Sequence, residues 1–289
     1  LEHCHRTIIA GSTDGHEVEI LAIKHLKKVL KRMRYFFRDS CHTMNCTHKL
    51  IIKWLRHSDT ALIDILVSGK GSFAKRVQYS RAFKQIWINT QKGLSIQSLY
   101  NICETLCYNE TRYHSRTDPM CTLLNHWGSV LECLVEVSKD TSHPDDSAWA
   151  TRIIEATTGT HGFHRLATFA VEADFFHNCS EAVKQEDDDK HKLSVSQKHL
   201  ENAIDRASVL FGDGFVFDDE PNYSYTWQLM NGLRDDLTIF FGPSGSHVGK
   251  IGWHGVPEEY LEKPLRFANQ LFLLMKDFME TFFPYWSFR

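Results

Sequence analysis

One carboxylate near the start of the chain lies where a metal ligand is often found. Asp14 follows residues 8–13, a run that predicts a short strand, and it precedes Gly15 in a turn. An acid at the end of a buried strand is a common metal-binding group, although an Asp-Gly pair is more often only a turn. Asp14 is therefore a candidate catalytic residue and a candidate metal ligand.

Soft metal ligands follow within eight positions. Cys41, His42, Cys46 and His48 have the spacing C-H-x3-C-x-H. This spacing matches no standard zinc finger, and no second ligand pair lies at finger distance. Cys41, Cys46 and His48 remain a weak candidate metal site, and the plainer interpretation is ordinary buried thiols.

A polar and aromatic cluster occupies residues 111–116. It contains Arg112, Tyr113 and Arg116, and an aromatic ring beside an arginine suits stacking on a nucleic-acid base next to a phosphate. Asp118 and Pro119 then predict the start of an amphipathic helix, because apolar residues recur at steps of three and four up to Val137. The alternative is a helix start with ordinary surface charges.

Composition indicates a globular chain without bulk affinity for nucleic acid. The 289 residues are 42% hydrophobic and 24% charged, with a net charge of −3. Any nucleic-acid site must therefore be local. No apolar run approaches the roughly 20 residues of a membrane span, so we expect no membrane partner.

Hydrophobic periodicity predicts helices through most of the chain. We expect them over residues 17–38, 73–91, 163–184, 195–210 and 264–283, with residues 225–241 helical or mixed. Residues 140–147 and 211–222 read as loops. Residues 242–250 resemble a phosphate loop but lack the first glycine and the Ser or Thr of that motif, so we expect a flexible surface loop there.

The cysteines and glycosylation sequons leave the compartment open. Eight cysteines suit either free thiols or disulfides, and N-x-S/T sequons occur at Asn45, Asn109, Asn178 and Asn222. A secreted, disulfide-bonded helical glycoprotein that binds a partner is therefore a real alternative to an intracellular protein.

Four landmarks in order resemble the hAT family of DNA transposases. Residues 12–15 (S-T-D-G), 46–50 (C-T-H-K-L), 72–76 (S-F-A-K-R) and 107–116 (C-Y-N-E-T-R-Y-H-S-R) each resemble a family element. The resemblance implies a mainly α, multi-helix protein with a short β element near the N-terminus, the remnant of an RNase H-like sheet. It implies a partial RNase H-like segment over residues 1–40 (strand, Asp turn, long basic helix) and a helical insertion-like domain over residues 41–289.

The same resemblance assigns roles to the candidate residues. Asp14 would be one catalytic metal ligand, and His48, Arg112, Tyr113 and Arg116 would contact nucleic acid. Two-metal strand transfer needs three carboxylates, and the sequence shows only one of the three family elements. We therefore expect an inactive, fragmentary or domesticated relative without a cofactor, with Mg²⁺ bound only if an intact transposase site forms. Its expected function is a nuclear module that binds DNA or a protein partner, with homo-oligomers possible.

Overall fold

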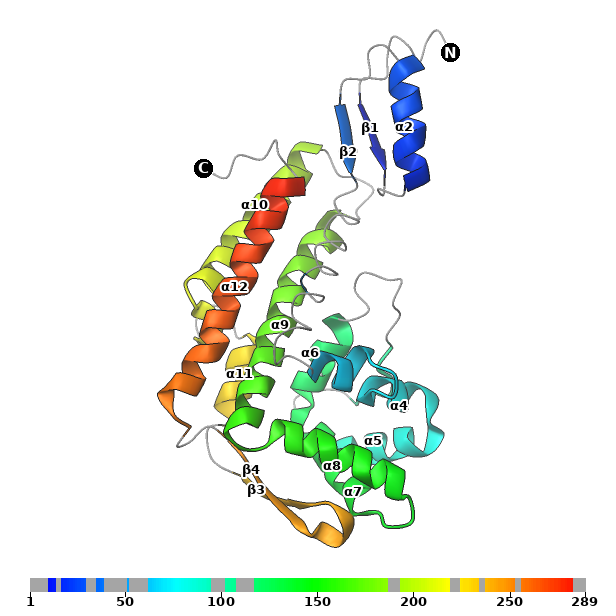
Figure 1. The fold of residues 1–289 in the computed structure, drawn as a ribbon, viewed down its shortest axis with the longest axis vertical. Helices are drawn as coiled ribbons and strands as arrows, with labels where there is room; N and C mark the ends of the chain where they lie inside the picture. The colour runs from blue at the N-terminus through cyan, green and yellow to red at the C-terminus, as the bar shows by residue number, and fades with distance from the viewer. Residues whose placement is uncertain are drawn as a thin grey trace.

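The computed structural model describes residues 10–13, 17–29, 35–38, 51, 62–94, 102–107, 117–186, 193–218, 224–233, 237–252 and 256–282. Most of these residues lie in helices, which confirms the predicted mainly α fold (Figure 1). In this part of the chain, no helix has the length and apolar character of a membrane span. The predicted domain limits stay predictions.

A small strand–helix–strand unit contains the first described elements. Strand β1 (Ala10–Thr13) pairs in parallel with β2 (Tyr35–Arg38), and helix α2 (Glu17–Val29) lies between them in the sequence. The single helix expected over residues 17–38 is therefore wrong at residues 35–38, which form a strand. The aromatic run that starts at Tyr35 favours a strand, and a parallel pair needs a crossover such as α2.

Helix α9 (Gly159–Glu186) is the centre of the helical body. It contacts α6, α8, α10, α11 and α12, as Figure 1 shows for the long green helix. Apolar residues of this helix, including Phe169, Ala173 and Phe176, are buried. Apolar side chains surround most of its circumference, which is the pattern of a helix enclosed by neighbours.

The other helical elements complete the helical body, some on α9 itself and others on its neighbours. In chain order they are η1 (Asp64–Ser68), α4 (Phe73–Tyr79), α5 (Arg81–Leu94), α6 (Thr117–Asn125), α7 (Trp127–Lys139), α8 (Pro144–Thr157), α10 (Leu193–Ala207), η3 (Ser208–Gly212), η4 (Phe215–Phe217), α11 (Tyr225–Gly232) and α12 (Glu258–Phe282).

Two predicted helices are each divided into two. The run after Asp118 breaks at His126, and the run over residues 73–91 breaks at Ser80. Ser80 has extended backbone angles, and its hydroxyl accepts a hydrogen bond from the amide of Phe83, so it caps the start of α5. The predicted apolar stripe of α6 and α7 is nevertheless buried along its length.

A β-hairpin replaces the helix-or-loop expectation for residues 237–250. Strand β3 (Leu237–Phe241) pairs antiparallel with β4 (His247–Ile251), and the hairpin lies at one end of the helical body (Figure 1). Ile239, Phe241 and Ile251 face the helices and are buried. The alternation of buried and exposed residues has the period of two that defines a strand, and it was too short to separate from a helical pattern in the sequence.

Candidate functional site

The residues that the sequence put forward lie outside the described residues. This holds for the candidate catalytic, metal and nucleic-acid-binding residues Asp14, Cys41, Cys46, His48, Arg112, Tyr113 and Arg116. Within the described residues, no group of three or more His, Cys, Asp or Glu side chains could hold a metal ion. One of the family-like segments, residues 72–76, is described, and its Arg76 lines a cavity that also contains acidic side chains.

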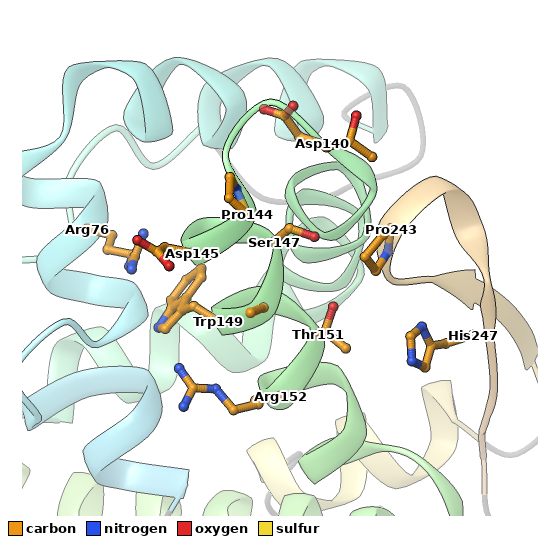
Figure 2. A pocket seen from close by; sticks show the side chains of 12 residues that line it. Arg76, Asp140, Pro144, Asp145, Ser147, Trp149, Thr151, Arg152, Pro243 and His247 are labelled. Atoms are coloured by element: carbon orange, nitrogen blue, oxygen red, sulfur yellow. The ribbon is translucent and has the colours of Figure 1, made fainter.

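This cavity lies over α8, between α4 and the turn of the β3–β4 hairpin (Figure 2). We name it the α8 cavity. Its volume is about 810 Å³, within the range of small-molecule and peptide-side-chain sites. It is lined by Arg76, Asp140, Thr141, Pro144, Asp145, Ser147, Ala148, Trp149, Thr151, Arg152, Pro243 and His247.

Arg76 is held in place at one wall of the α8 cavity. Ser72 caps α4 by accepting a hydrogen bond from the amide of Lys75, which sets the helix that carries Arg76. The guanidinium donates to Asp146 and lies 4.0 Å from the centre of the Trp149 ring. Because Asp146 neutralises its charge, Arg76 contributes to the shape of the cavity wall and adds little net charge.

Trp149 is the fixed platform under that arginine. Its indole Nε1 donates to the carbonyl of Gly71 over 3.0 Å, and the ring of Phe83 meets it edge-to-face at 5.5 Å. Arg152 follows one helical turn later, and Figure 2 shows its guanidinium beyond the indole from Arg76. Arg152 is exposed, and no described residue forms an ion pair with it.

Hydrogen bonds between three elements fix the opposite wall. Ser147 of α8 donates to the carbonyl of Ser138 at the end of α7, and the Ser138 hydroxyl accepts from the amide of Gly242 over 3.0 Å. Gly242 has a φ of 76°, and a Cβ there would lie 2.0 Å from Nδ1 of His247. Only glycine therefore allows the hairpin turn to pack its backbone against the His247 ring.

The entrance near the start of α8 is acidic. Asp140 binds the Ser142 hydroxyl and amide and the His143 ring, and these contacts lower the pKa of Asp140 to about 2. The contact with Asp140 raises the pKa of His143. Asp145 lies in the first turn of α8, where the helix dipole favours a carboxylate. The cavity thus has two unlike ends, acidic at the N-terminus of α8 and basic at Arg152.

Two buried acids lie outside the cavity on α9. Asp174 accepts hydrogen bonds from the amides of Tyr225 and Thr226 and from the Thr226 hydroxyl, at 2.7 to 2.9 Å. Burial nevertheless raises its pKa to about 6. Glu172 is fully buried, and neither of its oxygens has a partner among the described residues. Burial, and then the charge of Asp64, raise the pKa of Glu172 well above its usual value.

A second, smaller cavity of about 430 Å³ lies between α6, α7 and α11. Its lining is mostly apolar, with Leu131, Leu229 and Leu237 among its residues. Trp127 borders it, and the indole nitrogen of Trp127 is buried without a partner among the described residues. Such a cavity suits an apolar side chain or small molecule, but its polar features are few.

Comparisons with known protein families, with curated proteins and with solved structures find no match to this chain. Its function must therefore be argued from its own residues. Sequence reasoning missed Trp149, Arg152 and His247. The spacing of Trp149 and Arg152 on one helical face was a usable signal, whereas the approach of His247 depends on a hairpin that the sequence pattern did not predict.

Proposed function

We propose that this protein is a transposase-derived nuclear module that binds DNA or a protein partner and does not itself catalyse strand transfer. The observation that carries the binding role is the α8 cavity, where Arg76 and Trp149 form a fixed wall beside Arg152, which pairs with no acid among the described residues. Aromatic and arginine side chains held by neighbours are the usual anchors of recognition surfaces. The transposase origin, including an RNase H-like source for β1, α2 and β2, rests on the family resemblance of the sequence.

Two findings favour this proposal over a secreted, disulfide-bonded glycoprotein. Cys103, Cys107, Cys133 and Cys179, which are among the described cysteines, have thiols outside any disulfide. The sequon asparagine Asn178 is 4% exposed, and its side-chain nitrogen donates to the carbonyl of Ala203. An oligosaccharide on Asn178 would have no room in this fold, so that sequon is incompatible with a glycosylated folded state.

Single-stranded DNA binding tests the DNA part of the proposal. Fluorescence anisotropy with a labelled oligothymidylate would compare the unmodified protein with Arg112→Ala and Tyr113→Ala. We expect either substitution to weaken binding about tenfold, because stacking on a base contributes about 1–3 kcal/mol. Arg266→Ala is the matched control, since Arg266 is exposed and donates to Glu262 on its own helix. DNA binding that is absent, or equal in all four proteins, would reject a DNA-contacting role for this cluster.

A thiol count tests the alternative. Titration of the denatured, unreduced protein from its native source should give eight free thiols, one for each cysteine in the sequence. Four disulfides, or glycan on Asn178, would support the secreted glycoprotein and reject the nuclear module.

A further inference from the structure

The β3–β4 hairpin is a sheet with an unpaired edge. Among the described residues this sheet has two strands, so β3 pairs with β4 on one side and with no strand on the other. Within the same residues, no hydrogen bond between backbones joins β3 to any other element. The sequence of β3 is L-T-I-F-F, which lacks the charged residues and proline that usually protect such an edge from a further strand.

The outward face of the hairpin is apolar at its centre. Phe240 and Val248 are partners across the two strands, and their side chains are 58% and 63% exposed. The alternate residues of β3, Ile239 and Phe241, are buried on the opposite face. Neighbouring exposed apolar side chains mark interaction surfaces more often than single ones do. The hairpin therefore offers a further strand both an edge and an apolar face.

An apolar cavity adjoins the start of this edge. The second cavity, of about 430 Å³ between α6, α7 and α11, is lined by Leu237, the first residue of β3, and by no residue of β4. We name it the α11 cavity. None of the described residues that line it is charged, and its volume lies at the lower end of the range of ligand sites. A charged group would lose its hydration there without a partner, so we expect an uncharged, apolar occupant.

We propose that an extended, uncharged segment of a partner protein adds to the free edge of β3 and inserts a large apolar side chain into the α11 cavity. In this binding mode the backbone hydrogen bonds supply affinity, and the pocket selects the side chain. Because side chains alternate along a strand, other residues of the segment lie on the outward face, where they extend the patch of Phe240 and Val248. This surface is separate from the α8 cavity, and the inference goes beyond the proposed function.

The neutral character of the surface favours a peptide strand over other occupants. Neither β3 nor the described lining of the α11 cavity offers a cation to a phosphate, which nucleic acid would need. A small apolar molecule would fill the cavity and leave the strand edge unpaired. An extended peptide satisfies both features at once.

A cavity-blocking variant with a matched control tests the site. Gly232 is the last residue of α11 and lines the cavity, and a Cβ at this position meets nothing within 4 Å. Gly232→Phe therefore places a ring at the cavity where its first carbon has room. Gly93→Phe is the control, because Gly93 is also an exposed glycine in a helix with open space around a Cβ, and it does not line the cavity. Thermal melts check that both variants fold.

Peptide display supplies the probe. A random dodecapeptide library would be selected on the unmodified protein, and the selected peptides should share one large apolar residue in an uncharged centre without proline. Gly232→Phe should weaken their binding at least tenfold, because burial of a large apolar side chain contributes that much, and Gly93→Phe should leave it unchanged. Peptides that bind the unmodified protein and both variants equally would overturn the proposal.

N-methylation of one selected, resynthesised peptide tests strand pairing without any change to the protein. Methylation of every second backbone amide in the centre should weaken binding about tenfold each, and methylation of the amides between them should have little effect, because a strand directs alternate amides to its neighbour. A uniform response, or a period of three to four residues, would overturn strand addition.

Sedimentation of the unmodified protein tests for a second copy as the occupant. A dimer that Gly232→Phe dissociates would overturn the partner segment in favour of self-association, and a monomer supports the partner segment. These results are separable from those of the proposed function. Loss of the Arg112 and Tyr113 effects on DNA rejects the DNA role and leaves the peptide experiments unaffected.

Discussion

Two buried carboxyl groups on helix α9, those of Asp174 and Glu172, have opposite hydrogen-bonding environments. Asp174 faces α11 and accepts three hydrogen bonds from its first turn, whereas Glu172, two residues earlier, has no partner among the described residues. Both groups are fully or nearly fully buried. The difference shows that burial alone does not define the role of an acid, because the donors around it decide whether it stabilises the fold.

Substitution of Asp174 should give the largest change in the free energy of unfolding. Asp174→Ala removes the carboxylate that accepts from the amides of Tyr225 and Thr226, and we expect a loss of about 3 kcal/mol in the free energy of unfolding at pH 5. Urea denaturation measures it. The matched control is Asp205→Ala on the exposed face of α10, which should change stability by less than about 0.5 kcal/mol. Equal effects of the two substitutions would remove the distinction between the two sides of α9.

The pH dependence of stability follows from the same two acids. The pKa of Asp174 is raised from its ordinary value of 3.8 to about 6, so its contribution is fully present below pH 3.8 and is lost as pH rises through 6. Two pKa units correspond to about 3 kcal/mol. Glu172 acts in the same direction, and its loss extends to higher pH because its pKa is raised further above its usual value.

Denaturant melts between pH 4 and pH 7.5 should therefore show the part of stability due to these acids falling as pH rises. Glu172→Gln should flatten the upper part of that fall, because the amide does not titrate. A variant profile that matches the unmodified protein at every pH would contradict the assigned environment of Glu172.

Substitution of Glu172 should instead increase the stability of the fold. Glu172→Met keeps the length of the side chain and removes two oxygens that have no partner among the described residues, so we expect the free energy of unfolding to rise by about 1–3 kcal/mol at pH 7. Differential scanning calorimetry measures the accompanying rise in Tm. A marked loss of stability would mean that the carboxyl group has a partner, and the contrast with Asp174 would then disappear.

The smallest effect is expected at the cavity. Thr151→Val removes a buried hydroxyl without a partner among the described residues, and stability should rise by about 1 kcal/mol. Thr157→Val is the matched control on the same helix, because the Thr157 hydroxyl donates to the carbonyls of Ile153 and Ile154 at 3.1 Å. That variant should lose stability. Thermal melts of both variants would test whether hydrogen-bonding partners decide the effect of a buried hydroxyl on stability, as they do for the two carboxyl groups on α9.

Sequence reasoning was most successful where one face of a helix had to be apolar. The apolar stripe from Leu124 to Val137 is buried as predicted, and Phe169, Ala173 and Phe176 of the predicted helix α9 are buried as well. Sequence reasoning did not predict where helices break or where the hairpin turns. His126 and Ser80 end helices within continuous apolar patterns, and periodicity carries no information about such breaks. Its candidate residues, from Asp14 to Arg116, lie outside the described residues and remain predictions.

The sequence by itself determined the mainly helical architecture, because the spacing of apolar residues sets which faces can be buried. Only the tertiary structure decided the α8 cavity. Arg76, Trp149 and His247 come from three segments far apart in the chain, and their meeting depends on the Ser138 hydrogen bonds that join α7, α8 and the hairpin. The hydrogen-bonding environments of Glu172 and Asp174 also depend on the tertiary structure, since local sequence does not specify which donors a neighbouring helix presents.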